Sequence, residues 1–528
     1  MSQNLMIQGT MSGAGKSLLT AGILRVLKQD GYRVAPFKSQ NMALNSYITQ
    51  DGLEMGRAQV MQAEAAGIAP QVCMNPILLK PTSDVGSQVI VHGRVRGNYT
   101  AQEYFRMKKE LVPDILSAYE ELQKQADIIV IEGAGSPAEI NLKAEDIVNM
   151  GLAKLLDAPV LLVGDIDRGG VFAQLLGTVL LLEEEERRRI KGFVINKFRG
   201  DEKLLSPGPE MLYGRCGIPT LGVLPYLKLQ IDDEDSMSEQ LSTRTESGSG
   251  RLYKAEDDSI ESNMLGGQPC IQIVVIKLPH ISNFTDFNPL VRYPFVSVRY
   301  VERSDRLGNP DLIILPGSKN TIHDMAWLRS NGLEAALLER AAAGCRIVGI
   351  CGGYQMLGER IADAAGSEGG GEIDGIGLLP VTTVFHKEKQ RSRISGRVGN
   401  LPRDWQTFCG LNVEGYEIHM GECDYTDEHI GADCVGVPFC TLADGRADGC
   451  VQGRVLGTYL HGIMETDEFT KRLILLLGEE KGIDRNILEE AAANSLSYHA
   501  FKESQYDLLA DAVRRHLDIS KIYDIMCA

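Results

Sequence analysis

The feature that most constrains the fold of this chain is the alternation of short, unbroken apolar runs with helix-length segments. In the first half, such runs occupy residues 4–9, 32–37, 127–135, 159–167 and 190–198. Helical patterns lie between them, as at 17–29 and 104–125. Unbroken apolar runs of this length are typical of strands buried on both faces. The alternation predicts an α/β fold with a doubly wound, mainly parallel sheet, which binds ligands at the carboxyl ends of its strands.

A second strand series follows a change in composition. Residues 232–268 are rich in Asp, Glu, Ser and Gly, which is typical of a linker. New apolar runs then lie at 271–279, 310–317, 345–350 and 453–462, and the C-terminal tail has helical periodicity. We therefore expect a first α/β domain over 1–231, a linker over 232–268, a second α/β domain over 269–480 and a helical extension over 481–528.

Composition narrows the functional classes. The net charge of −17 disfavours a nucleic-acid partner, because a phosphate backbone would repel the chain. No apolar stretch approaches the roughly 20 residues that span a bilayer, so we expect a cytoplasmic protein without a membrane partner. The 11 cysteines form no CxxC pair, which argues against a zinc site or a disulfide framework. Nothing in the sequence predicts the oligomeric state.

A phosphate-binding loop is predicted at "GTMSGAGKS", residues 9–17, between an apolar run and an amphipathic segment. Gly13 and Gly15 would let backbone N–H groups turn toward phosphate oxygens, Lys16 would reach the terminal phosphates, and Ser17 could ligate Mg²⁺. The common spacing requires glycine at position 10, where this chain has Thr10. The loop is therefore one residue longer than the usual form, and we expect it to bind ATP.

The longer loop resembles that of dethiobiotin synthetase and its relatives. Partitioning ATPases have a lysine where this chain has Met11, which argues against a switch ATPase. The resemblance implies that Asn196 contacts the adenine and that Lys38 contacts an acyl phosphate or a substrate carboxylate.

Acidic residues at two strand ends could hold Mg²⁺ directly or through water. Glu132 is the favoured candidate, because enzymes resembling dethiobiotin synthetase have an acid before a similar glycine turn. Asp165 and Asp167 lie at the end of the run at 159–167. Helix capping or a turn remains an alternative role for these two aspartates.

A sulfur nucleophile is predicted in "GICGGYQ", residues 349–355. Cys351 directly follows a buried run and precedes a helical segment, so a sharp turn would expose its thiol near a helix N-terminus. The pattern GxCxGxQ resembles the nucleophile turn of class I glutamine amidotransferases. This resemblance implies that His461 is the base, and that Gly317, Ser318 and Gly352 form an oxyanion hole.

One position departs from the class I pattern. Those enzymes have glutamate two residues after the histidine, where this chain has Ile463. Glu465 is expected to lie beyond the strand end and to be a poor substitute. We therefore expect His461 to work in a dyad with Cys351, oriented by a backbone carbonyl or another uncharged group.

This departure, together with "GYEIHMG" at 415–421, "LPHISNFTDFNPL" at 278–290 and the P-loop domain, resembles the cobyric acid synthase family over nearly the whole chain. The resemblance implies ATP- and glutamine-dependent amidation of the b, d, e and g carboxylates of adenosylcobyrinic acid a,c-diamide. ATP, Mg²⁺, glutamine and a corrinoid would then be its ligands, with no tightly bound organic cofactor. Two alternatives stay open: the sister enzyme that amidates the a and c carboxylates, and a P-loop switch with a degenerate amidase domain.

Overall fold

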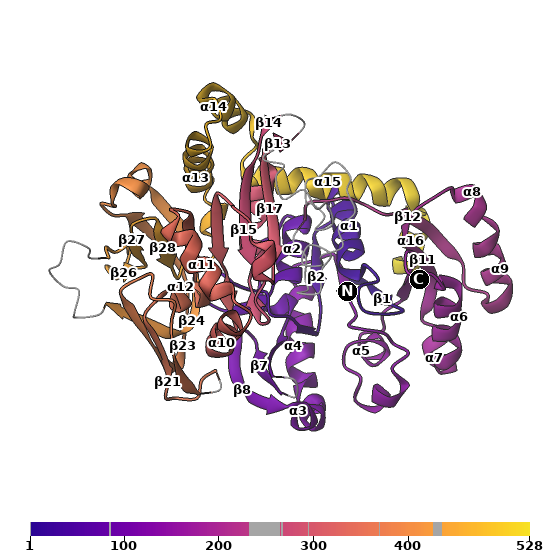
Figure 1. Cartoon of the computed structure of the whole chain (residues 1–528). Helices are drawn as coiled ribbons and strands as arrows, with labels where there is room; N and C mark the ends of the chain where they lie inside the picture. The colour runs from indigo at the N-terminus through magenta and orange to yellow at the C-terminus, as the bar shows by residue number, and fades with distance from the viewer. Residues whose placement is uncertain are drawn as a thin grey trace. The chain divides into compact units, whose positions relative to one another are not determined.

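A computed structural model describes residues 2–83, 86–231, 264–265, 268–293, 295–368, 370–425 and 436–527. The chain divides into two compact units (Figure 1). The first holds the described residues of Met1–Ala43, Leu53–Glu234 and Lys502–Ala528, and the second holds those of Leu44–Gly52 and Asp235–Phe501. The linker predicted over 232–268 lies almost entirely outside the described residues.

The first unit is built on a six-stranded parallel sheet with the order β12-β11-β10-β1-β9-β2. Its strands are β1 (Gln3–Gly9), β2 (Val34–Phe37), β9 (Ile128–Glu132), β10 (Val160–Asp165), β11 (Ile190–Phe198) and β12 (Thr220–Pro225). Every residue of β9 and β10 is buried, which is the pattern of a sheet covered on both faces. The predicted parallel α/β fold is confirmed, and all five apolar runs of the first half are strands.

Helices surround this sheet, and a smaller sheet of short strands accompanies it. The helices are α1 (Lys16–Gln29), α2 (Arg57–Ala66), α3 (Ala101–Met107), α4 (Val112–Gln123), α5 (Met150–Leu155), α6 (Val171–Leu181), α7 (Glu184–Arg187), α8 (Glu202–Leu205) and α9 (Pro207–Cys216). The smaller sheet, which the sequence did not predict, joins β3 (Gln40–Met42), β6 (Ile77–Ser83), β7 (Gly86–Val91) and β8 (Arg94–Thr100). The helix predicted over 104–125 is split into α3 and α4. Pro113 lies in the first turn of α4, where a proline favours the start of a new helix.

The C-terminal helices α15 (Tyr498–His516) and α16 (Ile519–Cys527) contribute to the core of the first unit from Lys502 onward. A Cβ on Gly22 of α1 would lie 2.7 Å from Cγ2 of Val513, so the two helices approach closely there. Arg25 of α1 pairs with Glu503 at 2.9 Å and with Asp507 at 2.8 Å. Of the helical extension predicted over 481–528, the part from Lys502 onward therefore belongs to the P-loop unit, and the part up to Phe501, with α14, belongs to the second unit.

The second unit has its own six-stranded sheet with the order β17-β15-β18-β20-β28-β27, parallel except for the edge strand β27. Its strands are β15 (Ile271–Ile276), β17 (Val296–Val301), β18 (Leu312–Leu315), β20 (Arg346–Ile350), β27 (Cys450–Gln452) and β28 (Val455–Thr458). Its helices are α10 (Thr321–Ser330), α11 (Leu333–Ala342), α12 (Gly352–Leu357), α13 (Asp467–Glu480) and α14 (Arg485–Asn494). The second α/β domain is thus confirmed as a mainly parallel sheet.

An additional, largely antiparallel sheet in this unit was not predicted. It contains the long paired strands β23 (Val381–Val398) and β24 (Asn412–Tyr425), with β21 (Arg360–Asp363), β22 (Gly371–Asp374), β25 (Cys440–Leu442) and β26 (Ala447–Asp448). The remaining short strands of this unit are β4 (Ser46–Ile48), β13 (Met264–Leu265), β14 (Gln268–Pro269), β16 (Ile281–Ser282) and β19 (Gly317–Ser318), and β5 (Glu54–Gly56) belongs to the first unit.

Two further expectations concern cysteines and membranes. Each cysteine in the described ranges is a free thiol, as expected from the absence of CxxC pairs. Within the same ranges, no helix has both the length and the apolar character needed to span a bilayer.

Candidate active sites

The thiol of Cys351 sits at a strained turn between β20 and α12. Its φ of 51° and ψ of −109° lie outside the regions that residues with a side chain usually adopt. The Cys351 amide donates to the carbonyl of Thr458 on β28 at 2.9 Å, which ties the turn to the neighbouring strand. A Cβ on Gly353 would lie 1.8 Å from the carbonyl oxygen of Leu315, so only glycine allows this close packing. The structure therefore has a sharp turn at the position predicted from the sequence, and the role of Cys351 as nucleophile stays a prediction.

The imidazole of His461 follows β28 and lies between Cys351 and an acid that the sequence did not single out. Its Nδ1 is 2.7 Å from Oδ2 of Asp286, and Cys351 is near enough to raise the pKa of the imidazole. The expected dyad with an uncharged orienting group is therefore wrong. Asp286 lies in a 3-10 helix over Phe284–Arg292 and is only 5% exposed. Because water is largely excluded there, the carboxylate interacts strongly with the imidazole.

Ile463 and Glu465, two and four residues after the histidine, behave as the sequence indicated. Ile463 is buried among apolar residues, and Glu465 ends a 3-10 helix over Ile463–Glu465. The third member of the triad thus comes from a segment far upstream. The only signal for it in the sequence was an aspartate between the two phenylalanines of "NFTDFNPL".

The surroundings of His461 favour its charged form. Burial alone lowers the pKa of this histidine, but the charge of Asp286, the charge of Cys351 and the hydrogen bonds to both raise it to about 10. An imidazolium at neutral pH stabilises a thiolate beside it, and the thiolate is the nucleophilic form of cysteine. The triad is therefore suited to attack on a carbonyl carbon.

The predicted oxyanion residues lie next to this triad. A Cβ on Gly352 would lie 2.7 Å from the amide nitrogen of Ser318, so the loop after β18 and the nucleophile turn meet backbone to backbone. A Cβ on Gly317 would lie 3.1 Å from Cε1 of His461. The structure thus brings Gly317, Ser318 and Gly352 together beside the nucleophile, the arrangement that two converging N–H donors require.

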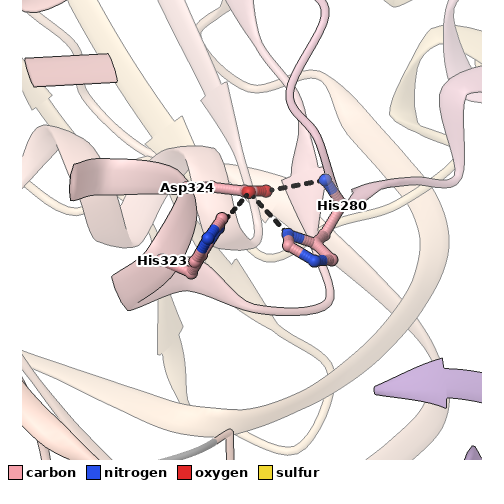
Figure 2. Close-up of side chains that lie close together, drawn as sticks. All are labelled: His280, His323 and Asp324. Carbon is pink, nitrogen blue, oxygen red and sulfur yellow. Dashed lines mark hydrogen bonds and ion pairs between the residues drawn. The ribbon is translucent and has the colours of Figure 1, made fainter. Parts of the chain in front are cut away.

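A buried carboxylate holds the loop that carries Ser318. Asp324 accepts hydrogen bonds from the Ser318 hydroxyl at 2.6 Å and from the backbone amide of His280 at 3.2 Å, and its Oδ1 lies 2.8 Å from Nδ1 of His280 (Figure 2). Figure 2 also shows the ring of His323 on the other side of this carboxylate, 3.7 Å away. These hydrogen bonds tie Asp324 to Ser318 and to His280. We assign Asp324 to positioning of the oxyanion loop.

In the first unit, the P-loop has the backbone shape predicted for it. Gly13 and Gly15 have φ values of 74° and 90°, which favour glycine, and α1 begins directly after Gly15. The Lys16 ammonium donates to the carbonyl oxygens of Met11 and Gly135, each at 3.1 Å. The lysine is thus held across the mouth of the loop, where phosphate oxygens could replace these carbonyls.

The carboxylate of Glu132 is the centre of a buried polar cluster at the end of β9. It accepts hydrogen bonds from the Ser17 hydroxyl at 2.9 Å, from the Lys38 ammonium at 2.9 Å and from the side-chain amide of Gln62. Ser17, Glu132 and Lys38, all predicted as site residues, are therefore brought together. Hydroxyl and carboxylate oxygens that lie side by side are the ligands that Mg²⁺ prefers. Gln62 is the member of this cluster that the sequence did not indicate.

The remaining candidates lie at the ends of β10 and β11. The Asn196 amide donates to the carbonyl of Ala14 at 2.9 Å, and a Cβ on Gly15 would lie 2.1 Å from its nitrogen, so Asn196 covers the loop. Asp165 accepts from the amide of Asp167 at 2.9 Å and pairs with Lys197 at 3.1 Å. These bonds to Asp165 fit the turn role left open for it, and the adenine contact of Asn196 stays a prediction.

A P-loop unit and a Cys-His-Asp amidase unit in one chain define a glutamine-dependent, ATP-using amide ligase. Residues 5–237 match the CobQ/CobB/MinD/ParA nucleotide binding domain, and residues 272–469 match the CobB/CobQ-like glutamine amidotransferase domain. The cobyric acid synthase of Lachnoclostridium phytofermentans is 54% identical over 543 residues, covering 100% of this chain and 99% of the relative. That of Ruminiclostridium cellulolyticum is 53% identical over 526 residues, covering 100% and 97%. The chain belongs to the cobyric acid synthase family.

Proposed function

We propose that this chain uses ATP and glutamine to amidate the b, d, e and g carboxylates of adenosylcobyrinic acid a,c-diamide, giving adenosylcobyric acid. The observation that carries the proposal is the presence in one chain of the Cys351-His461-Asp286 triad and a P-loop with Lys16 held across its mouth. Full-length relatives named cobyric acid synthase support the choice of substrate.

The amidase unit would release ammonia from glutamine. The Cys351 sulfur attacks the side-chain amide carbon, and the negative charge that develops on oxygen is stabilised by N–H groups at Gly352 and Ser318. The imidazolium of His461 gives its proton to the departing nitrogen, so ammonia leaves and a thioester remains. His461 then takes a proton from water, which attacks the thioester and releases glutamate. Asp286 keeps the imidazole oriented through both steps.

The P-loop unit would activate the carboxylate. A carboxylate oxygen of the corrinoid attacks the γ-phosphorus of ATP, ADP leaves, and ammonia then displaces phosphate from the acyl phosphate to form the amide. Lys16 and the loop N–H groups would hold the phosphates, and Lys38, which contacts Glu132, would bind the carboxylate or the acyl phosphate.

Ser17 and Glu132 are the proposed direct ligands of Mg²⁺, and Asp165 is a more distant candidate. The ion, when bound, neutralises charge on the phosphates. We propose no tightly bound organic cofactor. A cytoplasmic location follows from the proposal, since ATP and glutamine are cytoplasmic metabolites.

The test is to incubate the purified chain with the a,c-diamide, MgATP and glutamine and to identify the products by mass spectrometry. We expect four successive replacements of a carboxyl hydroxyl by an amino group. Amidation of cobyrinic acid at a and c, with none of the a,c-diamide, would instead support the sister activity. A chain that hydrolyses no glutamine would support the P-loop switch with a degenerate amidase domain.

A further inference from the structure

The segment Leu44–Gly52, with the sequence LNSYITQDG, belongs to the amidase unit although the chain on either side of it belongs to the P-loop unit. It follows β3 closely in sequence and includes β4. The P-loop unit resumes at Leu53. Residues of the amidase fold are thus contributed by the N-terminal part of the chain, far in sequence from Cys351 and His461.

The first contact of this segment is with Asn283. The Ser46 amide donates to Oδ1 of Asn283 at 3.1 Å, which directs the other end of that side chain, Nδ2, to within 3.3 Å of Nδ1 of His461. Asn283 has a φ of 52° and begins the 3-10 helix that carries Asp286, whose amide donates to the Asn283 carbonyl at 3.0 Å. The Ser46 amide therefore holds the residue from which the turn to the triad acid starts.

The second contact is with Tyr416 on β24. The Tyr416 hydroxyl donates to the carbonyl of Ser46 at 3.3 Å, and the ring of Tyr47 lies against its ring with centroids 5.8 Å apart. Tyr416 in turn stacks on His461, with ring centroids 5.3 Å apart and planes 17° from parallel. The backbones of Tyr416 and His461 also exchange two hydrogen bonds of 3.1 and 2.9 Å.

A third set of contacts fixes the segment itself. Arg393 on β23 donates to the Tyr47 hydroxyl and lies 5.2 Å from the centre of its ring. Ile48 forms a small buried cluster with Tyr416 and Ile418, and the carbonyl of Ile418 lies 3.7 Å from the Cys351 sulfur. The segment is therefore packed on the strand that borders both the base and the nucleophile.

We propose that residues 44–52 are a positioning segment for the glutaminase triad. The backbone of Ser46 holds Asn283 on one side of His461 and Tyr416 on another, so the orientation of the imidazole depends on this stretch of the N-terminal chain. The proposal rests on the proposed function only in assigning glutamine hydrolysis to Cys351. According to the proposal, glutamine hydrolysis depends on a segment that lies in sequence between two parts of the ATP-binding unit.

The test uses the full-length enzyme with Tyr47→Ala and Tyr416→Phe. Tyr47→Ala removes the ring that contacts Tyr416, and Tyr416→Phe removes the hydroxyl bound to Ser46 while keeping the ring stacked on His461. Matched controls are Met42→Ala, an exposed residue shortly before the segment, and Tyr425→Phe, which removes a hydroxyl bound at 2.9 Å to Gly449 from the same strand as Tyr416. Glutamate release gives kcat and KM for glutamine without any corrinoid, and amide formation from ammonium reports on the other site.

We expect kcat for glutamine to fall about fivefold in Tyr416→Phe and about tenfold or more in Tyr47→Ala, with KM within about twofold of the wild-type value. Synthesis from ammonium and both controls should match the wild type. The proposal is overturned if both variants keep the wild-type kcat, or if glutamine- and ammonium-dependent rates fall together. If Tyr47→Ala does not fold, Tyr416→Phe decides by the same criteria. A wild-type chain that releases glutamate but amidates no corrinoid would count against the proposed function and leave this test valid.

Discussion

The carboxylate of Asp286 lies 2.7 Å from Nδ1 of His461, although 175 residues separate them in sequence. The amidase unit therefore has a charged third member in its triad, delivered by a 3-10 helix rather than by the position two residues after the histidine. Under the proposed function, the triad residues have the same three functions as in other triads, with the acid taken from a different part of the fold.

Replacing Asp286 by asparagine should separate the two activities. Asp286→Asn keeps the shape of the side chain but removes the charge that orients and stabilises the imidazolium, so glutamine-dependent turnover should fall by roughly 10²- to 10⁴-fold. Synthesis from ammonium should stay within about twofold of the wild-type rate. Glu465→Gln is the matched control, because this nearby acid ends a separate 3-10 turn. A loss in Glu465→Gln as deep as that in Asp286→Asn would contradict the assignment.

The pH dependence of glutamine hydrolysis should reflect the effect of Asp286 on the pKa of His461. Because the pKa of His461 is raised to about 10, its proton is retained through neutral pH and is lost only as the pH rises through that value. We expect glutaminase kcat/KM in the wild type to decline only near that pH. In Asp286→Asn the main charge that raises the pKa is gone, so the residual activity should decline at lower pH. Coincident alkaline limbs in the two proteins would show that Asp286 does not control the imidazole.

The oxyanion loop should depend on Asp324. Asp324→Asn weakens the bonds to the Ser318 hydroxyl and to His280, and we expect kcat for glutamine to fall about tenfold with a smaller change in KM. His323→Ala removes the more exposed neighbour of the same carboxylate and should change kcat by less than about twofold. Equal effects of the two substitutions, measured by glutamate release, would argue against a loop held chiefly by Asp324.

Lys16 should serve both nitrogen sources. Its ammonium is held across the P-loop by two carbonyls, so Lys16→Ala should lower both the glutamine- and the ammonium-dependent synthesis by roughly two or more orders of magnitude. Glutamate release in the absence of ATP should be unaffected. If the variant still made amide from ammonium at the wild-type rate, the loop would not bind the reacting nucleotide.

Both parallel sheets and the nucleophile turn could be predicted from the sequence because their signals are local. Strands buried on both faces leave unbroken apolar runs, and a glycine-flanked Cys351 after such a run implies a sharp turn. The antiparallel strands β23 and β24 were missed because they lack such a local signal. In β23 only Val381, Thr383, Phe385 and Val398 are buried, and the stretch between Phe385 and Val398 carries many charges, so no continuous apolar run marks the strand.

Asp286 and the segment 44–52 could not be found from local pattern, because their roles arise only where distant parts of the chain meet. An aspartate in a short aromatic turn has many structural uses, and only its distance to His461 makes it a triad member. In the same way, nothing in LNSYITQDG indicates that Ser46 contacts both Asn283 and Tyr416.

The division of labour between the two units is tested most directly with Cys351→Ala, assayed with the a,c-diamide and MgATP and with either glutamine or ammonium as the nitrogen source. The sulfur is needed only to release ammonia, so the variant should make no product from glutamine and should make amidated corrinoid from ammonium at close to the wild-type rate. A variant that fails with ammonium as completely as with glutamine, while remaining folded, would contradict the two-site account.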